Sequence, residues 1–141
     1  MPTMSQDEAL AFIAARARTA KLATVRKDGS PRVVPVWVDL DAGTLVFTVG
    51  EDSLKAKAMK RDPRVAMCFD DETPPFAFVT VTGTVTFSDD LDEMLVWATR
   101  IGGRYMGVDR ADEYGRRNAV PSELLVRLTP SRIVGQSGVA D

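Results

Sequence analysis

Histidine is absent from this chain of 141 residues. Without an imidazole, the chain lacks the most common general base, the Ser-His-Asp and Cys-His pairs, and most ligands for zinc. The sequence therefore predicts no metal site and no catalytic triad. If the protein is an enzyme, we expect its reactive group to come from a cofactor.

Cysteine is nearly as scarce, because Cys68 is the single example and lies in the apolar run from Val65 to Phe69. One thiol cannot form an intrachain disulfide, which favours a reducing, cytoplasmic setting. Free cysteine is among the most frequently buried residues, so we expect Cys68 to be a small buried strand residue.

Long hydrophobic runs are missing as well. Apolar stretches such as Val33 to Val38 are far shorter than the ~20 residues of a membrane-spanning helix, and the N-terminus does not resemble a signal peptide. The 18 Lys+Arg and 20 Asp+Glu give a net charge of -2, which argues against a general nucleic-acid binder. We expect one domain, residues 1–141, with neither a membrane nor a nucleic acid as partner.

Against this balance, one short segment is strongly basic. Its ten residues from 55 to 64 carry five cations: Lys55, Lys57, Lys60, Arg61 and Arg64. A helix that starts near Ser53 and ends before Pro63 would put Lys57, Lys60 and Arg61 on one face and leave Leu54 and Ala58 to pack. The segment predicts a site for a small anion, with a solvated basic face as the alternative.

The remaining pattern predicts mostly strands. A capping box at residues 5–8 begins an amphipathic helix with apolar residues at Leu10, Ile13, Ala14 and Ala17. Expected strands cover 20–26, 32–40, 44–49, 64–69, 76–87, 124–128 and 132–134, the first three forming consecutive antiparallel strands. A second helix is expected from residue 91 to Gly102-Gly103, followed by a broken region, 104–121, with one short helix near 109–116.

Two strand residues carry further information. Pro35 has no N–H to donate, so it marks a strand edge or an irregularity where a ligand can lie, an ordinary edge strand being the alternative. Gly83 interrupts the apolar face of 76–87, which predicts a bend, a bulge or a close backbone approach. The strand-rich order favours an α+β fold built on a six- to seven-stranded antiparallel barrel over a doubly wound sheet.

Four motifs in order carry a resemblance to a known family. They are the hairpin of residues 22–36, the strand Thr44 to Val49, the basic segment from Ser53 to Ala66, and the ending from Leu125 to Val134. Together they resemble the flavin- and deazaflavin-binding split β-barrel proteins related to pyridoxamine 5′-phosphate oxidase, and within that family the branch that binds coenzyme F420. The resemblance covers nearly the whole chain.

The resemblance implies an FMN-binding-like split β-barrel that forms a homodimer, with each cofactor at the subunit interface. It implies that the cofactor phosphate is held by Lys55, Lys57 and Lys60, whereas Arg61 and Arg64 are weaker candidates because each can pair with neighbouring acids. The other cofactor-binding positions that it implies lie on two strands: Arg32, Val33, Pro35, Val36 and Trp37, then Thr48 and Val49. It assigns no catalytic residue.

The implied activity is an F420-dependent oxidoreductase that transfers a hydride between the deazaflavin and a small conjugated organic substrate. Two alternatives stay open: an FMN-dependent oxidase or reductase, and a non-catalytic protein that binds the cofactor or a tetrapyrrole.

A second group of cations and phenols follows Gly103: Arg104, Tyr105, Arg110, Tyr114, Arg116 and Arg117. In the family this stretch can approach the partner's cofactor or the substrate, and a solvated loop is the alternative. Trp37 and Trp97 can both be core aromatic residues, and for Trp97 we prefer that interpretation.

Overall fold

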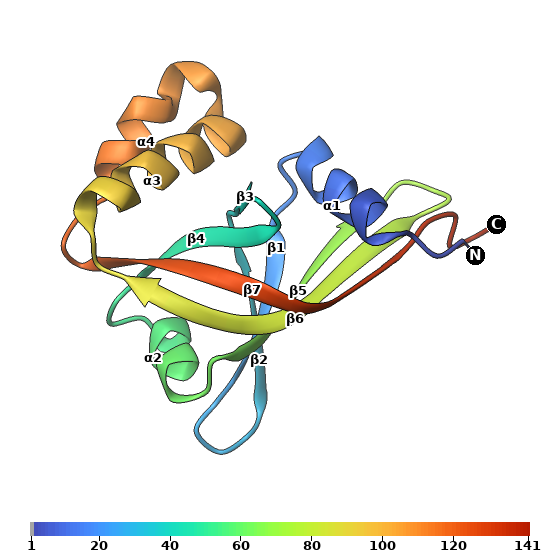
Figure 1. Cartoon of the computed structure of the whole chain (residues 1–141), viewed down its shortest axis with the longest axis horizontal. Coiled ribbons are helices and arrows are strands. Elements are labelled where there is room, and N and C mark those ends of the chain that lie inside the picture. The colour runs from blue at the N-terminus through green and yellow to red at the C-terminus, as the bar shows by residue number, and fades with distance from the viewer. Residues whose placement is uncertain (1) are drawn as a thin grey trace.

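The centre of the molecule is a seven-stranded antiparallel sheet, seen in a computed structural model that describes residues 2–141 (Figure 1). Its strands are β1 (Ala20–Val25), β2 (Pro31–Val36), β3 (Asp39–Asp41), β4 (Thr44–Gly50), β5 (Arg64–Asp71), β6 (Ala77–Ser88) and β7 (Glu123–Gln136). The order β2-β1-β5-β6-β7-β4-β3 places consecutive strands β2 and β3 at opposite edges. Within residues 2–141 the sheet therefore curls like a barrel without closing, which confirms the predicted α+β split barrel.

The expected strand over 32–40 is two strands, and this corrects the prediction of three consecutive antiparallel strands. β2 pairs with β1, whereas β4 pairs with β3 and β7. Pro35 lies in β2, at an edge of the sheet, as its missing N–H predicted. After Trp37 the backbone N–H of Val38 donates to the Tyr105 hydroxyl at 3.1 Å rather than to a strand, and the chain crosses to the far edge.

β6 follows its predicted alternation and its predicted irregularity. Threonines 82, 84 and 86 are exposed while Val79, Val81 and Val85 are buried. The register with β7 shifts between Thr82 and Gly83, where a Cβ on Gly83 would overlap the carbonyl of Thr129. β7 runs through Pro130 as one strand, although residues 129–131 were expected to separate two strands. The bulge lies in β7 itself, because Ser131 has no partner in β6.

Over residues 2–141, four α-helices accompany the sheet: α1 (Gln6–Ala15), α2 (Leu54–Arg61), α3 (Leu91–Met106) and α4 (Ala111–Asn118). α3 continues through Gly102-Gly103, so the predicted helix end is wrong. A Cβ on Gly102 would lie 2.5 Å from the Tyr114 Cβ, which shows that this glycine lets α4 approach α3. The region expected to be broken is therefore largely helical, and Figure 1 shows α3 and α4 side by side at one end of the sheet.

Two clusters of buried side chains hold these elements together. The larger fills the curled sheet and receives Ala9 and Ile13 from α1. The smaller joins Met94 and Trp97 of α3 to strands β4 and β7, which confirms Trp97 as a core residue. Ala14 within α1 is exposed, and Ala17 lies beyond the end of this helix at Ala15, so neither packs as predicted. Cys68 in β5 is half-buried rather than buried.

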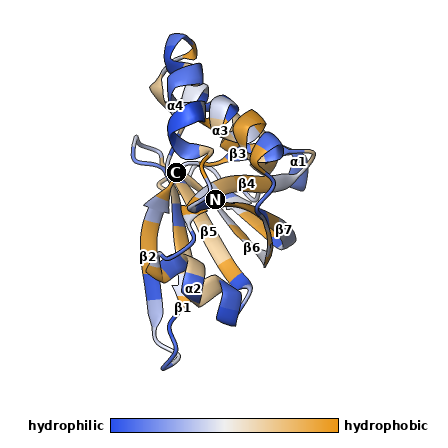
Figure 2. Cartoon of the chain, turned by 90° about the vertical axis from the view of Figure 1, so that its left-hand side faces the viewer, coloured by the Kyte–Doolittle hydropathy of each residue, from blue (hydrophilic) through white to orange (hydrophobic). Residues whose placement is uncertain are grey.

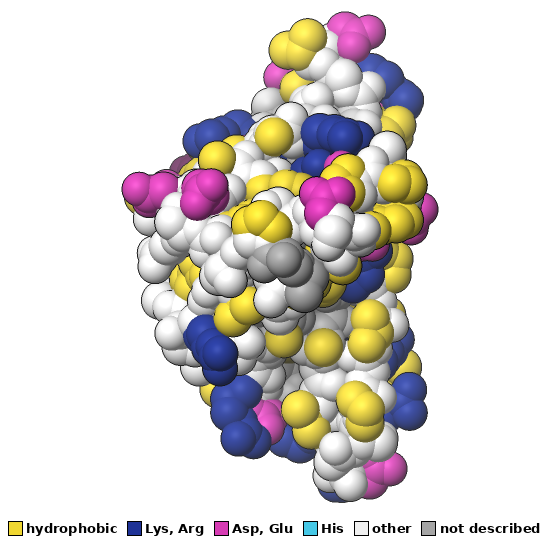
Figure 3. Space-filling model, turned by 90° about the vertical axis from the view of Figure 1, so that its right-hand side faces the viewer, with side chains coloured by type: hydrophobic (Ala, Val, Ile, Leu, Met, Phe, Trp, Pro, Cys, Tyr) yellow, Lys and Arg dark blue, Asp and Glu magenta, His cyan; other side chains and the backbone are white. Residues whose placement is uncertain are grey.

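The surface carries charges of both signs. Figure 2 shows α4 as mainly hydrophilic, and Figure 3 shows basic, acidic and hydrophobic side chains interspersed on one face of the molecule. Leu54 is 66% exposed, so the prediction that it packs under α2 is wrong. Among the described residues no helix is both long and apolar enough to cross a membrane.

Candidate functional site

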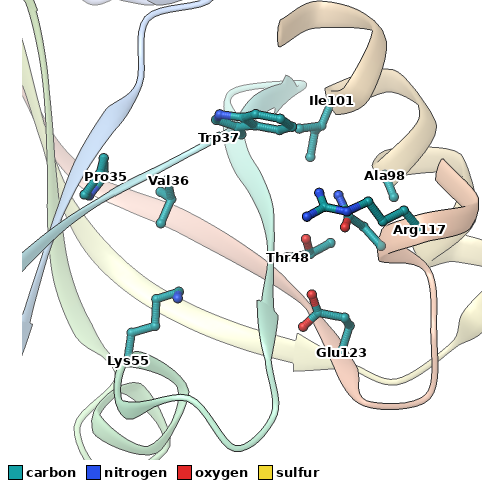
Figure 4. Close-up of a pocket in the computed structure, with 10 residues that line it drawn as sticks. Pro35, Val36, Trp37, Thr48, Lys55, Ala98, Ile101, Arg117 and Glu123 are labelled. Atoms are coloured by element: carbon teal, nitrogen blue, oxygen red, sulfur yellow. The ribbon is translucent and has the colours of Figure 1, made fainter. Parts of the chain in front are cut away.

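A cavity of about 300 Å³ opens where β2, β4 and α2 face the α3–α4 pair (Figure 4). Its lining comes from six elements and their flanks: Pro35, Val36, Trp37, Thr48, Lys55, Ala98, Ile101, Arg117, Asn118 and Glu123. Five of these ten residues are apolar or aromatic and five are polar or charged, so the cavity combines an apolar wall with converging polar groups, as small-molecule sites do.

Lys55 enters this cavity because of the way α2 begins. The Ser53 hydroxyl accepts the backbone N–H of Ala56 at 3.2 Å and donates to the Gly50 carbonyl at 2.7 Å. This cap fixes Lys55 in the first helical turn, half-buried, with its ammonium group directed into the cavity (Figure 4). The start of a helix also favours negative charge, so two effects attract an anion here.

A second cation, Arg117 of α4, faces the same cavity (Figure 4). From the sequence, Arg117 was recognised only as a member of the group of cations and phenols after Gly103. Arg117 reaches the cavity because α4 packs against α3, where Gly115 lies directly against Thr99. Lys55 and Arg117 therefore approach from opposite sides of the cavity, although 62 positions separate them in the sequence.

Trp37 forms an aromatic wall that is held in place by Tyr105. The two rings stack at a centroid distance of 5.2 Å and an interplanar angle of 4°. The Tyr105 hydroxyl donates to the Arg18 carbonyl at 2.7 Å and accepts the Val38 N–H at 3.1 Å. Tyr114 meets Trp37 at a tilted angle, with the centroids 5.8 Å apart.

The Arg104 guanidinium stabilises the end of α1. It donates to the carbonyls of Ile13 at 2.6 Å and Arg16 at 2.8 Å. These contacts and the hydrogen bonds of Tyr105 show that Arg104 and Tyr105 belong to the packed fold, so the solvated-loop interpretation is wrong for these two residues. Arg110 and Arg116 are exposed, and Arg110 pairs with Glu113 at 2.6 Å.

Glu123, at the first position of β7, was not recognised from the sequence. Its Oε2 atom is buried and has no hydrogen-bond partner among the described residues. Burial raises the pKa of this carboxyl, and the charges of Lys55 and Arg117 partly oppose that increase. An ordinary glutamate after Pro121-Ser122 carries no sequence signal for such a position.

A second cavity, of about 290 Å³, lies between α2 and the β1–β2 hairpin. Its lining residues are Arg26, Lys27, Arg32, Leu54, Lys57, Ala58 and Arg61. Five of these carry a positive charge, and within residues 2–141 no carboxylate joins them. Most of the wall that these residues present is apolar, because lysine and arginine contribute their carbon stems as well as their charges. The cavity therefore suits a ligand group that combines an apolar part with negative charge.

The residues predicted to bind the cofactor are thus distributed over both cavities. Pro35, Val36, Trp37, Thr48 and Lys55 line the first, whereas Arg32 and Lys57 line the second. The other three lie in neither lining of the described chain: Lys60 is exposed, Val33 is 62% exposed, and Val49 is 2% exposed in the core.

The two arginines considered weaker candidates differ. Arg61 lines the second cavity and donates to the Val25 carbonyl at 3.1 Å. Arg64 pairs with Asp62 at 2.8 Å, and this contact lowers the pKa of Asp62 to about 2.

The chemistry of the first cavity fits a phosphate-bearing ring compound. Lys55 and Arg117 supply positive charge, the Thr48 hydroxyl can donate to a phosphate oxygen, and Trp37 offers a flat apolar face. A ligand with two separate negatively charged regions could place one region in each of the two cavities, on the two sides of α2.

Comparison with solved structures shows the same fold. A conserved hypothetical protein from Mycobacterium tuberculosis has a TM-score of 0.83 at 23% identity, covering 96% of this chain and 86% of its own. An F420 reductase has a TM-score of 0.66 at 24% identity, covering 87% of this chain and 94% of its own. A FAD-binding protein from Mesorhizobium loti has a TM-score of 0.70 at 21% identity, with 95% and 93% covered.

No protein of curated function matches the sequence. A family profile does match, and it spans residues 5–136, from the cap of α1 to the last residue of β7. Its description is pyridoxamine 5′-phosphate oxidase. The chain therefore belongs to the pyridoxamine 5′-phosphate oxidase family.

Proposed function

We propose that this protein is an F420-dependent oxidoreductase that transfers a hydride between the deazaflavin and a small conjugated organic substrate. The observation that carries the proposal is the pair of cavities on the two sides of α2, one with Lys55 and Arg117 beside Trp37, the other lined by five cations. F420 bears a phosphodiester and a tail of glutamate carboxylates, and these two regions match the two cavities in charge. A family whose members are generally oxidoreductases, and a structural neighbour that is an F420 reductase, support it.

The chain contributes binding and orientation, while the bound deazaflavin would supply the carbon that exchanges the hydride. Lys55 and Arg117 would hold the phosphodiester, and Lys57 with its neighbours in the second cavity would hold the tail carboxylates. Trp37, fixed by Tyr105, would support an apolar group against one wall. Val36, Ala98 and Ile101 would exclude water from the same cavity, which strengthens charge-assisted contacts.

An FMN-dependent oxidase or reductase is the second candidate. FMN also carries a phosphate for Lys55, and the structural neighbours include a FAD-binding protein. The five cations of the second cavity would then have no ligand group to bind, which is why we favour F420.

We also propose a cytoplasmic homodimer with the site at the subunit interface. Leu54, which lines the second cavity, is 66% exposed, and Val33, which follows Arg32 of that lining in the sequence, is 62% exposed. A partner subunit would cover these apolar side chains. Light scattering during size-exclusion chromatography tests this proposal, and a monomeric mass at micromolar protein concentration would contradict it.

The function is tested by titrating purified protein with F420 and, separately, with FMN, following the fluorescence of each. We expect F420 to bind more tightly, and reduced F420 to be oxidised in the presence of some members of a panel of enones and quinones. Tighter binding of FMN, or a flavin identified in the purified protein, would favour the second candidate. Binding of neither cofactor would overturn both, and binding without turnover of any substrate would indicate a carrier or sensor.

A further inference from the structure

Glu123 has no part in the phosphate binding proposed above, although it shares the first cavity with both cations. It lies opposite Gly50 of β4 in the sheet, and Figure 4 shows its carboxylate directed into the cavity. Of the described residues that line the cavity, Glu123 alone is acidic. A carboxylate at an anion site requires an explanation, because like charges repel strongly where water is partly excluded.

The carboxylate is incompletely satisfied in the free protein. Its Oε2 atom is buried without a hydrogen-bond partner among residues 2–141. In the same part of the chain no ion pair within 4.0 Å joins it to Lys55 or Arg117, although both charges act on it. Burial outweighs their attraction, so the pKa of Glu123 is raised above that of an ordinary glutamate.

The position of Oε2 is also the place where an anion would be attracted. A Cβ on Gly50 would lie 3.4 Å from this atom and 3.9 Å from the Cβ of Ser53, the residue that caps α2. The carboxylate therefore lies beside the start of α2, with Lys55 and Arg117 lining the same space. In the free protein Glu123 supplies the negative charge that a bound phosphate would otherwise bring.

We propose that Glu123 competes with the ligand's phosphate for Lys55 and Arg117, and that binding is accompanied by uptake of a proton on Glu123. The identity of the ligand rests on the proposed function. Protonation removes the repulsion between carboxylate and phosphate, and it converts the carboxyl into an O–H donor that can bond to a phosphate oxygen. The proton comes from solvent and stays on the side chain until the ligand leaves.

Other ionisable groups around the cavity have different surroundings. Glu51 and Asp52, in the turn between β4 and α2, are exposed. On α3, Arg100 pairs with Asp39 at 3.5 Å, and Asp89, which follows β6, lines a separate hollow beside Leu124. Lysine and arginine stay charged at neutral pH, so Glu123 is the cavity group that can gain a proton there.

The test compares the affinity for F420 of the wild type and of Glu123→Gln between about pH 4 and about pH 8, a range that starts near the ordinary glutamate pKa of about 4.3 and extends well above it. Wild-type affinity should fall with rising pH, by up to about tenfold per pH unit above the pKa of Glu123 in the free protein, and should level off above its higher pKa in the complex. Glu123→Gln should bind more tightly at the higher pH, and the ratio of the two affinities removes any titration of F420 itself. Calorimetry in buffers of different ionisation enthalpy should detect proton uptake only in the wild type.

Glu51→Gln is the matched control, because it removes an exposed carboxylate from the same end of α2 and should behave as the wild type. Equal pH dependence in the wild type and Glu123→Gln would overturn the inference while leaving the proposed function intact. Lack of F420 binding at every pH would contradict the proposed function, and sulfate then serves as the probe. In that case the carbon-13 signal of the Glu123 carboxyl should titrate at higher pH with sulfate than without, and an unchanged titration would reject the competition.

Discussion

At the scale of single residues, Lys55 is the predicted phosphate ligand for which the structure gives the most specific surroundings. Its backbone is fixed by the Ser53 cap and its ammonium faces Arg117 across the cavity, whereas Lys60 on the same helix is exposed. The Lys55→Gln substitution should weaken F420 binding about tenfold or more, since a hydrogen bond to a charged group contributes roughly 1.5–3 kcal/mol. Fluorescence titration measures the change.

Lys60→Gln removes the same charge from the same helix and is the control for this substitution. Its affinity should stay within about threefold of the wild type, because exposed charges contribute little after screening by salt. An equal loss in both variants would show that α2 acts through its total charge and that Lys55 has no individual role.

Tyr105 determines the position of Trp37 through its ring and its hydroxyl. Tyr105→Phe keeps the stacked ring but leaves the Val38 N–H and the Arg18 carbonyl without their partner. We expect the free energy of unfolding to fall by about 1–3 kcal/mol, the cost of unsatisfied buried polar groups. Urea denaturation measures this loss. Tyr114→Phe should lose less, because it removes a hydroxyl that bonds to neither of these two backbone groups.

The types of residue in the sequence were enough to predict part of the candidate cofactor site. A cluster of lysines in a chain of net negative charge predicted an anion site, and the position of Pro35 predicted an edge strand. Glu123 and the partnership of Arg117 with Lys55 could not be predicted, because both depend on β7 and α4 meeting at the cavity. No local pattern in the sequence predicts that β7 and α4 come together at this cavity.

At the scale of elements, the packing of α4 against α3 determines that Arg117 lies at the first cavity. Gly115 makes this contact possible, because a Cβ there would overlap the Thr99 hydroxyl and lie 3.1 Å from its Cβ. Gly115→Ala should therefore reduce the free energy of unfolding by roughly 1–3 kcal/mol, as is usual for overpacked sites, and should also weaken F420 binding.

Thr99→Ala provides the matched test of this explanation. It removes the hydroxyl that the new methyl would overlap, so the double variant should recover part of the stability lost by Gly115→Ala. Thermal unfolding of the two single variants and the double variant measures the coupling. Strict additivity would mean that the loss has another origin, such as the helix propensity of residue 115.

At the scale of the whole molecule, several carboxylates at or near the surface determine how stability responds to acid. The pKa values of Glu8, Asp28, Asp62 and Asp71 are lowered, chiefly by hydrogen bonds that their charged forms accept. A group with a lowered folded-state pKa binds fewer protons in the folded state. Its stabilising effect is complete above its unfolded pKa of about 4 and is lost as pH falls through the folded value.

The melting temperature should therefore decline as pH falls from about 4 toward 2, where Asp62 titrates. Asp62→Asn should reduce the slope of this decline, because it removes the contact with Arg64 that holds that pKa at about 2. Asp52→Asn, an exposed carboxylate in the turn before α2, is the control. An identical slope in both variants would reject the role given to Asp62.

The sequence by itself determined the local structure and the family of this protein. The capping residues Ser5 and Ser53, the alternating valines and threonines of β6 and the cations of α2 each depend on neighbours in the chain, so their patterns could be recognised directly. Tertiary structure decided that α2 lies between two cavities. Lys55 lines one cavity and Lys57 lines the other, although the sequence grouped both lysines as one phosphate site. Tertiary structure also decided that glycines of α3 are contact points and that Glu123 lies among the cations, because these depend on distant segments packing against each other.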